Sequence, residues 1–347
     1  MANQFVTLKD LTALKNTDAV VGLVDNIVNV APEIDVVLGR PISDIHYEAS
    51  IMTAVGSNAA FRAIGGGVQL SAPSFDRKRF NCFPWDCQME VPEDYLESAS
   101  VDNPVGSILE FHATAAMRQK ALAWGKQFYL GSANDKNGPP GLIDFLAVQR
   151  TQVDSRTGLK IDQVVDAGGT AAGKCQTVWF IKQGPQGVHW IFGKGQGIKM
   201  NPWRQQRTLG ADSTAGTPTY RTAWVANTFG WVGTSMANYH AVGAIINVDA
   251  TIQANGTYTY PLTDAQVSQL WAKFPITEKP DLCFATQAAI ASLQASRTVT
   301  NMVQSGNRDW TGNAAPTAAW PTNLPTAGNI RIIPTDSIVA ANRLILN

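Results

Sequence analysis

The sequence is poor in charge and shows no excess of either sign. Only 16% of its 347 residues are Asp, Glu, Lys or Arg, against about 25% in a typical soluble domain. The 27 basic residues balance the 27 acidic ones. The net charge therefore gives no reason to expect tight binding to nucleic acid or to an anionic membrane, although weak contact with nucleic acid stays compatible with it.

Cysteine and histidine are scarce, with four residues of each. The histidines stand singly at His46, His112, His189 and His240. Because the four cysteines do not form a ligand pattern either, we expect free thiols and no metal site. The chain has no run of about 18 apolar residues and no apolar signal core at its start, so we expect a protein made in a cytoplasm, without a transmembrane helix.

One segment, from Gly168 to Cys175, fits the spacing of a phosphate-binding loop. Such a loop needs a Ser or Thr hydroxyl for magnesium at its last position, which Cys175 occupies, and it should open a helix. Here the following residues, QTVWFIK, predict a strand. We interpret the segment as a β-turn and predict no nucleotide hydrolysis. No local arrangement that would activate a nucleophile occurs elsewhere, so the sequence predicts no catalytic residue and no cofactor.

The longest predicted helix runs from Asn103 to Gly131. Asn103 followed by Pro104 is typical of a helix start, and a glycine such as Gly131 is typical of its end. The apolar residues fall into two stripes. One contains Leu109, Ala113, Ala116, Met117, Trp124 and Phe128, and the other contains Ile108, Phe111, Ala115 and Leu122. Two apolar faces predict either a core helix of a monomer or a spine that another segment or subunit covers.

Extended structure is predicted from His46 to Val91, around a turn of three glycines at residues 65–67. Aromatic residues there lie beside a basic triplet, Arg77-Lys78-Arg79. Contiguous exposed apolar surface usually marks a partner surface. The alternative is that these aromatics fold back onto the core of their own chain.

The remaining segments predict sheets and two further helices. Strand patterns rich in Val, Ile, Trp and Phe include QTVWFIKQG, GVHWIFGKG, TYRTAWVANTFGWVGTS and HAVGAIINVD. Thr263 is a predicted helix cap, and a second helix is expected in TQAAIASLQASRT. Two short helical patterns in the first 50 residues lack large apolar faces, as in an arm that lies on another surface. This mixture predicts an α+β fold.

The order of these elements resembles that of the major capsid proteins of tailed double-stranded DNA bacteriophages, which have the Hong Kong 97 fold. The resemblance covers nearly the whole chain and is carried by FRAIGGGVQLS, FYLGSANDKNGPPGL, TVWFIKQGPQGVHWIFGKGQGIKM, YRTAWVANTFGWVGTS with AIINVD, and IRIIPTDSIVAANRLIL. One departure is that the VWFIKQG and VHWIFGKG strands directly follow the spine helix, whereas they usually come late.

The resemblance implies a division of the chain into named parts. Residues 1–45 would be an N-terminal arm and 46–92 an extended loop that overlaps a neighbour. Residues 93–130 and 216–254 would form the peripheral domain, and 131–215 and 255–347 the axial domain. The expected inter-subunit contacts in the extended loop are Phe61, Arg62, Arg77, Arg79, Phe80, Phe83 and Trp85.

The resemblance also implies a structural, non-enzymatic function in the icosahedral shell of a virion. Copies of the chain would assemble as hexamers and pentamers together with portal and scaffolding proteins and, in some phages, a decoration protein. The shell would enclose double-stranded DNA without reading its sequence, after synthesis in the host bacterial cytoplasm. The alternatives are a β-rich receptor-binding protein of the virion and an enzyme whose site is assembled from dispersed residues.

Overall fold

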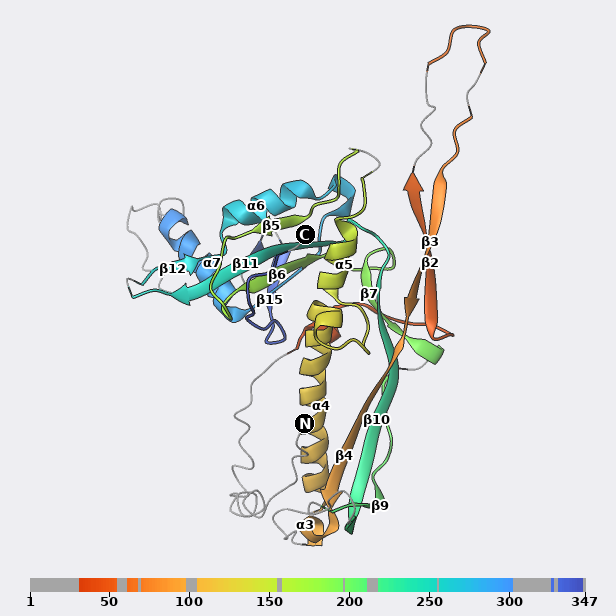
Figure 1. The fold of residues 1–347 in the computed structure, drawn as a ribbon, viewed down its shortest axis with the longest axis vertical. Coiled ribbons are helices and arrows are strands. Elements are labelled where there is room, and N and C mark those ends of the chain that lie inside the picture. Colours follow the sequence, from red (N-terminus) through yellow and green to blue (C-terminus); the bar gives the residue numbers. More distant parts are fainter. Residues whose placement is uncertain are drawn as a thin grey trace, which may run out of the picture.

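A computed structural model describes residues 31–54, 61–67, 70–97, 105–154, 158–195, 197–210, 218–254, 256–301, 326–327 and 330–345. It contains two separate sheets joined by one long helix, and a two-stranded hairpin that projects from the body (Figure 1). The expected helical patterns at the start of the arm lie outside the described residues.

The long helix α4 spans Val105–Leu130 and confirms the predicted spine. It ends where Gly131 adopts a φ of +54°, a conformation that favours glycine. A Cβ at Gly131 would overlap Asp144 Oδ2 and Gly141 N, so close packing also requires glycine there. Asp144 accepts hydrogen bonds from the backbone N–H groups of Ser132 and Gly141, which ties the end of α4 to helix α5 (Leu142–Gln149). The expected cap at Asn103 lies outside the described residues.

The six-stranded sheet is built around β10 (Tyr220–Met236). β10 pairs antiparallel with β4 (Phe83–Pro92) along ten residue pairs, and on its other edge with β7 (Val188–Phe192). Further members are β1 (Gly39–Pro41), β8 (Lys199–Met200) and β9 (Arg204–Leu209). Helix α4 lies along this sheet, with the short helix α3 (Glu93–Glu97) at the end of β4 (Figure 1).

The seven-stranded sheet has β11 (Val242–Ile252) and β6 (Gln176–Ile181) at its centre. Its other members are β5 (Val164–Asp166), β12 (Tyr258–Tyr260), β13 (Leu282–Ala285), β14 (Thr326–Ala327) and β15 (Ile330–Pro334). Helices α6 (Asp264–Lys273) and α7 (Gln287–Asn301) pack on it, and the predicted cap at Thr263 is confirmed by a capping box with Gln266. Single 3-10 turns occur at Gly131–Ala133, Gly193–Gly195 and Ile276–Glu278.

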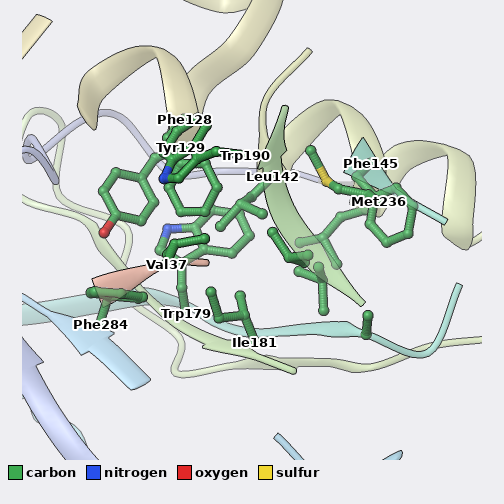
Figure 2. Packing of buried hydrophobic residues seen from close by; sticks show 14 of the residues in the cluster. Val37, Phe128, Tyr129, Leu142, Phe145, Trp179, Ile181, Trp190, Met236 and Phe284 are labelled. Atoms are coloured by element: carbon green, nitrogen blue, oxygen red, sulfur yellow. The ribbon is translucent and has the colours of Figure 1, made fainter. Parts of the chain in front are cut away.

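A continuous series of aromatic rings joins the two sheets through the C-terminal half of α4. It consists of Trp85, Trp124, Trp190, Phe128 and Tyr129 in succession, with Trp179 and Phe284 both next to Tyr129. The centroids of neighbouring rings lie 4.7 to 6.2 Å apart. Figure 2 shows its middle and far end, where Phe128 and Tyr129 meet rings from both sheets. Because aromatic side chains bury large areas, this series is a main source of cohesion between the sheets.

The two predicted stripes of α4 differ along its length. Trp124 and Phe128 of the larger stripe are buried, as expected. In the first half of the helix, Met117 of the same stripe and Phe111 of the second stripe are exposed. Among the described residues, this part of α4 lies beside the six-stranded sheet, called the long sheet below, and beside α3, away from the seven-stranded sheet (Figure 1). The described part of the subunit therefore covers it incompletely.

Several sheet memberships differ from the sequence-based division. The strand patterns of β10 and β11 were expected in one domain, but β11 pairs with β6, β5 and β12 in the other sheet. β4 was expected in the extended loop, but it belongs to the long sheet through its pairing with β10. Likewise β6 and β7, adjacent in sequence, lie in different sheets.

Candidate assembly surfaces

The projecting hairpin consists of β2 (His46–Ala54) and β3 (Ser74–Asn81). Its strands are held by antiparallel pairs from His46–Asn81 to Ala54–Ser74. The described residues between the strands expose their large apolar side chains almost completely: Phe61 and Ile64 are each 109% exposed and Leu70 is 92% exposed. Met52 and Phe75, which face each other across the strands, are also exposed. The far end of the hairpin is therefore an apolar surface that the described part of the subunit does not cover.

The outward face of the hairpin carries charged residues nearer its base. Arg77 and Arg79 are exposed on this face, opposite Ser50 and Glu48. Arg77 Nη1 lies 3.6 Å from Glu48 Oε2, a solvent-exposed ion pair that contributes little to stability. Near the tip, Arg62 donates a hydrogen bond of 2.6 Å to the carbonyl of Gly66 and so supports the glycine turn. All three arginines are exposed to solvent, so another surface can reach them.

Three of the seven expected contact residues are covered by their own subunit instead. Phe80 is buried and stacks on Tyr47, with ring centroids 6.4 Å apart. Trp85 is half-buried against Trp124, and Phe83 is half-buried in the long sheet. This corrects the expectation of uncovered aromatics: the chain turns back into the body at Asn81, so the residues that follow belong to β4 and not to the loop. Phe61, Arg62, Arg77 and Arg79 are exposed, as the expectation requires.

Lys78, the middle residue of the basic triplet, points the opposite way from its two neighbours. Its Nζ atom lies over the rings of Phe145, Tyr239 and Phe80, at 4.6, 4.7 and 5.2 Å from their centroids. It donates a hydrogen bond of 3.0 Å to the carbonyl of Met236. Burial lowers the pKa of Lys78 from 10.5 to about 8.

A second lysine that the sequence did not single out lies inside the subunit. Lys120 of α4 is buried, with Nζ 3.9 Å from the centroid of Trp85, and it donates to both oxygen atoms of Thr228 on β10. Burial lowers its pKa as well. Through this side chain the spine helix is fixed to the long sheet.

The end of the arm is fixed to the spine by a buried carboxylate. Glu33 of α2 (Glu33–Val36) is fully buried, and its Oε2 accepts a hydrogen bond of 2.9 Å from Thr335, which follows β15. Trp190 donates to the backbone carbonyl of Glu33 at 3.3 Å. Burial raises the pKa of the Glu33 carboxyl. Three distant segments, namely the arm, α4 at Gly125 and the chain after β15, therefore meet at this group.

The glycine-rich segment from Gly168 to Cys175 is followed by strand β6, which confirms that it does not open a helix. Its backbone instead contacts the C-terminal segment of the chain. Cys175 and Ala341 exchange backbone hydrogen bonds of 3.0 and 2.8 Å, and the Gly173 N–H donates to Asn342 Oδ1 at 3.1 Å. The groups that would bind a phosphate thus hold the tail of the same chain.

The described residues contain no cluster of three or more His, Cys, Asp or Glu side chains that could hold a metal ion. All four cysteines are free, as predicted. Within the same part of the chain, no helix is both long and apolar enough to cross a membrane. What the described surface offers is a projecting apolar hairpin and a partly uncovered spine, which are features of a subunit that joins other subunits.

Comparisons with known proteins identify the kind of assembly. A family model described as major capsid protein GP7 matches residues 128–316, more than half of the chain. The fold is similar to that of a near-atomic structure of bacteriophage Epsilon15, with a TM-score of 0.67 and 13% identity, covering 100% of this chain and 99% of that one. The bacteriophage JBD30 capsid gives a TM-score of 0.49 at 11% identity, covering 96% and 99%. No curated protein sequence matches the chain.

The chain is a shell-forming structural protein with the Hong Kong 97-type fold, as the resemblance implied. It belongs to the major capsid protein GP7 family. Its place is the capsid shell of a bacteriophage virion, where many copies assemble around the packaged genome. The receptor-binding and enzyme alternatives are therefore set aside as descriptions of its main function.

Proposed function

We propose that the β2–β3 hairpin is the element by which each subunit of the shell overlaps its neighbour. The observation that carries this is the complete exposure of Phe61, Ile64 and Leu70 at the far end of the hairpin. Apolar side chains of this size, gathered on one projecting element, are typical of a protein interface. In a shell of identical subunits the covering surface belongs to another copy of this chain.

We propose Phe61, Arg62, Arg77 and Arg79 as the contact residues of the hairpin, and we withdraw Phe80, Phe83 and Trp85 from that role. Aromatic and arginine side chains are enriched at the energetic centres of interfaces. The four retained residues are exposed on the hairpin, whereas Phe80 is buried and Phe83 and Trp85 are half-buried in the subunit.

The proposal includes a revised division of the chain. The extended loop would be residues 46–81, and the peripheral domain would comprise α3, α4 and the six-stranded sheet. The axial domain would comprise the seven-stranded sheet with α5, α6 and α7, and residues 1–38, which include α2, would form the arm. This division is supported by strand pairing, because every strand is assigned to the sheet in which it forms hydrogen bonds.

We further propose the finer features that the family resemblance implies. Subunits would form hexamers and pentamers, join a portal, use a separate scaffolding protein, and accept a decoration protein in some phages. The chain would be synthesised in the host bacterial cytoplasm, enclose double-stranded DNA without reading its sequence, and catalyse no reaction. The balanced charge and the strand after the glycine-rich segment support the last two points.

The test is to replace residues 61–73 with a short Gly-Ser linker. A deletion reaching Trp85 would be uninformative, because it would remove the buried Phe80 and three of the ten residue pairs between β4 and β10. We expect a folded subunit with a normal circular dichroism spectrum and unchanged melting, which sediments as a monomer or capsomer. Shells formed at the wild-type yield would refute the proposal.

A point variant with a matched control sharpens this test. We expect Phe61→Ser to reduce shell formation, because it removes an aromatic side chain from the proposed interface. Ile276→Ser makes a comparable change at a residue 88% exposed on the other part of the molecule. Equal assembly defects in the two variants would indicate a general effect of surface polarity and not a contact by the hairpin.

A further inference from the structure

The side chain of Lys78 connects the hairpin to two other parts of the subunit. Lys78 lies on β3, Phe145 lies on α5, and Tyr239 and Met236 lie at the turn from β10 to β11. Phe145 and Tyr239 are stacked, with ring centroids 6.2 Å apart and planes 9° from parallel. The lysine ammonium lies over both rings and over Phe80 beside it. One cation therefore bridges three segments that are distant in sequence.

This ammonium has no carboxylate ion-pair partner among the described residues; its polar contact there is the Met236 carbonyl. Burying a charge without a counter-ion is unfavourable, and an apolar side chain of the same length would fill the same space at a lower desolvation penalty. Directional contacts fix a geometry that apolar packing alone would leave adjustable. The lysine is thus better suited to specifying an orientation than to adding stability.

The hairpin is also attached to the body through Tyr47, close to Lys78. The angle of the hairpin depends on both attachments. Tyr47 on β2 packs edge-on against His189 of β7, with centroids 5.8 Å apart, and Arg40 lies over the same tyrosine ring at 5.3 Å. With both attachments in place, and with Ala49 and Phe80 buried at its base, the hairpin is held at a fixed angle. If Lys78 releases, the base of the hairpin around Tyr47 and Ala49 stays attached and becomes a pivot.

A small rotation about such a pivot has a large effect at the tip. Leu70, an exposed residue toward the tip, lies eight residues before Lys78 along the chain, or roughly 26 Å away at the rise of an extended strand. A tilt of about 10° would then move Leu70 by about 4.5 Å, the full distance of a side-chain contact. Figure 1 shows the hairpin extending well clear of the body from its base.

We propose that Lys78 is a positioning residue for assembly: its caged ammonium sets the angle of the β2–β3 hairpin, so that the tip reaches its site on a neighbouring copy of the chain. The inference rests on the proposed role of the hairpin as the overlapping element. Lys78 itself does not touch the neighbour. It acts through the geometry of the hairpin on the contacts made by Phe61 and the residues around it.

The variants for the test are Lys78→Met, which is unbranched, one atom shorter and uncharged, and Lys78→Arg, which keeps a cation. Tyr239→Leu removes one ring of the cage and leaves the lysine in place. The matched control is Lys194→Met, because Lys194 lies over the single ring of Trp231 at 5.2 Å in an exposed turn. All four changes are made in the full chain.

Two properties are measured for each variant. The first is the distance distribution between spin labels carried by noncanonical residues at positions 64 and 276, both highly exposed, in unassembled subunits. The second is the yield of shells by sedimentation. We expect Lys78→Met and Tyr239→Leu to broaden the distance distribution and to lower the shell yield about tenfold, the effect of losing roughly 1.4 kcal/mol of cation–π and hydrogen-bond energy. Lys78→Arg should retain most of both properties, and Lys194→Met should match wild type.

A wild-type distance distribution in Lys78→Met, or in Tyr239→Leu if the first variant does not fold, would overturn the inference. This outcome is separate from failure of the proposed function. If replacing residues 61–73 left shells normal, the hairpin would not be the overlapping element, whatever the label distances showed. If that replacement blocked assembly while Lys78→Met changed neither distances nor yield, the hairpin role would stand and the role of Lys78 would fall.

Discussion

Gly125 lies inside the 26-residue helix α4, where glycine is normally unfavourable. Replacing a helix-interior glycine with alanine usually stabilises a protein by about 0.8 to 1 kcal/mol. Here a Cβ would overlap Glu33 Oε1 and Ser337 Oγ and would lie only 2.7 Å from Ser337 Cβ. Both neighbours are fully buried, so neither can move into solvent. We therefore predict that Gly125→Ala destabilises the subunit, against the helix propensity.

The size of the effect follows from the groups that must move. Overpacking a closed site costs about 1 to 3 kcal/mol. Displacing the Glu33 carboxylate also weakens its hydrogen bond to Thr335, and a buried acceptor left unpaired costs about 1 to 3 kcal/mol. After subtracting the propensity gain, we expect a net loss of roughly 2 kcal/mol. For a chain of this length that lowers the melting temperature by about 3 °C.

The assay is calorimetry or urea denaturation of unassembled subunits. Ala123→Gly, at an exposed position of the same helix, provides the scale of intrinsic propensity and should destabilise by about 1 kcal/mol. In a Glu33→Ala background, Gly125→Ala should be less harmful because one of the two overlaps is gone. A Gly125→Ala subunit as stable as wild type, or more stable, would refute the idea that the arm, the spine and the C-terminal segment are packed through this glycine.

Three further outcomes are expected. Trp124→Ala removes the ring that links Trp85 to Trp190 and should cost about 3 to 5 kcal/mol in urea denaturation; an unchanged midpoint would contradict the burial of this residue. Thiol reagents should modify Cys87 alone in the folded subunit, as checked by peptide mass spectrometry, since the other three cysteines are buried. Because Lys78 binds its proton more weakly in the folded state, folding stability should rise between about pH 8 and 10.5, and this rise should be smaller in Lys78→Met.

The sequence predicts local features of this fold well because each has a local physical cause. The end of α4 needs a residue that tolerates a positive φ, and Gly131 supplies it. The helix after Thr263 begins with a side chain that caps its own backbone. The strand after the glycine-rich segment follows from a run of β-branched and aromatic residues. None of these features depends on a distant partner.

Sheet membership depends on distant partners, and here the strand pairing differs from the sequence-based division. β10 and β11 are separated by five residues and both look like buried strands, yet they belong to different sheets. The chain changes sheets at the turn that carries Tyr239. No feature of the local pattern distinguishes such a turn from a hairpin, because the alternative partners, β4 and β6, are far away in sequence.

The basic triplet on β3 shows both what the sequence predicts and what it does not. The residues Arg77, Lys78 and Arg79 form one basic cluster in sequence, but successive residues of a strand point to opposite faces. Applying that alternation to a predicted strand separates Lys78 from the two arginines and places it on the face of Phe80. The alternation does not predict that a ring from α5 and a ring from the β10–β11 turn surround Lys78. That arrangement of Phe145 and Tyr239 is seen only in the structure.

In the glycine-rich segment, the spacing of the glycines predicts the backbone conformation but does not predict which group the backbone binds. Glycines at Gly168 and Gly173 do adopt positive φ angles, as in loops that present N–H groups to a bound group. A carboxamide oxygen and a backbone carbonyl are acceptors just as a phosphate is, and here Asn342 and Ala341 provide them. Because the acceptors lie more than 160 residues away in the same chain, the pattern alone identifies a backbone able to donate and leaves the acceptor to tertiary structure.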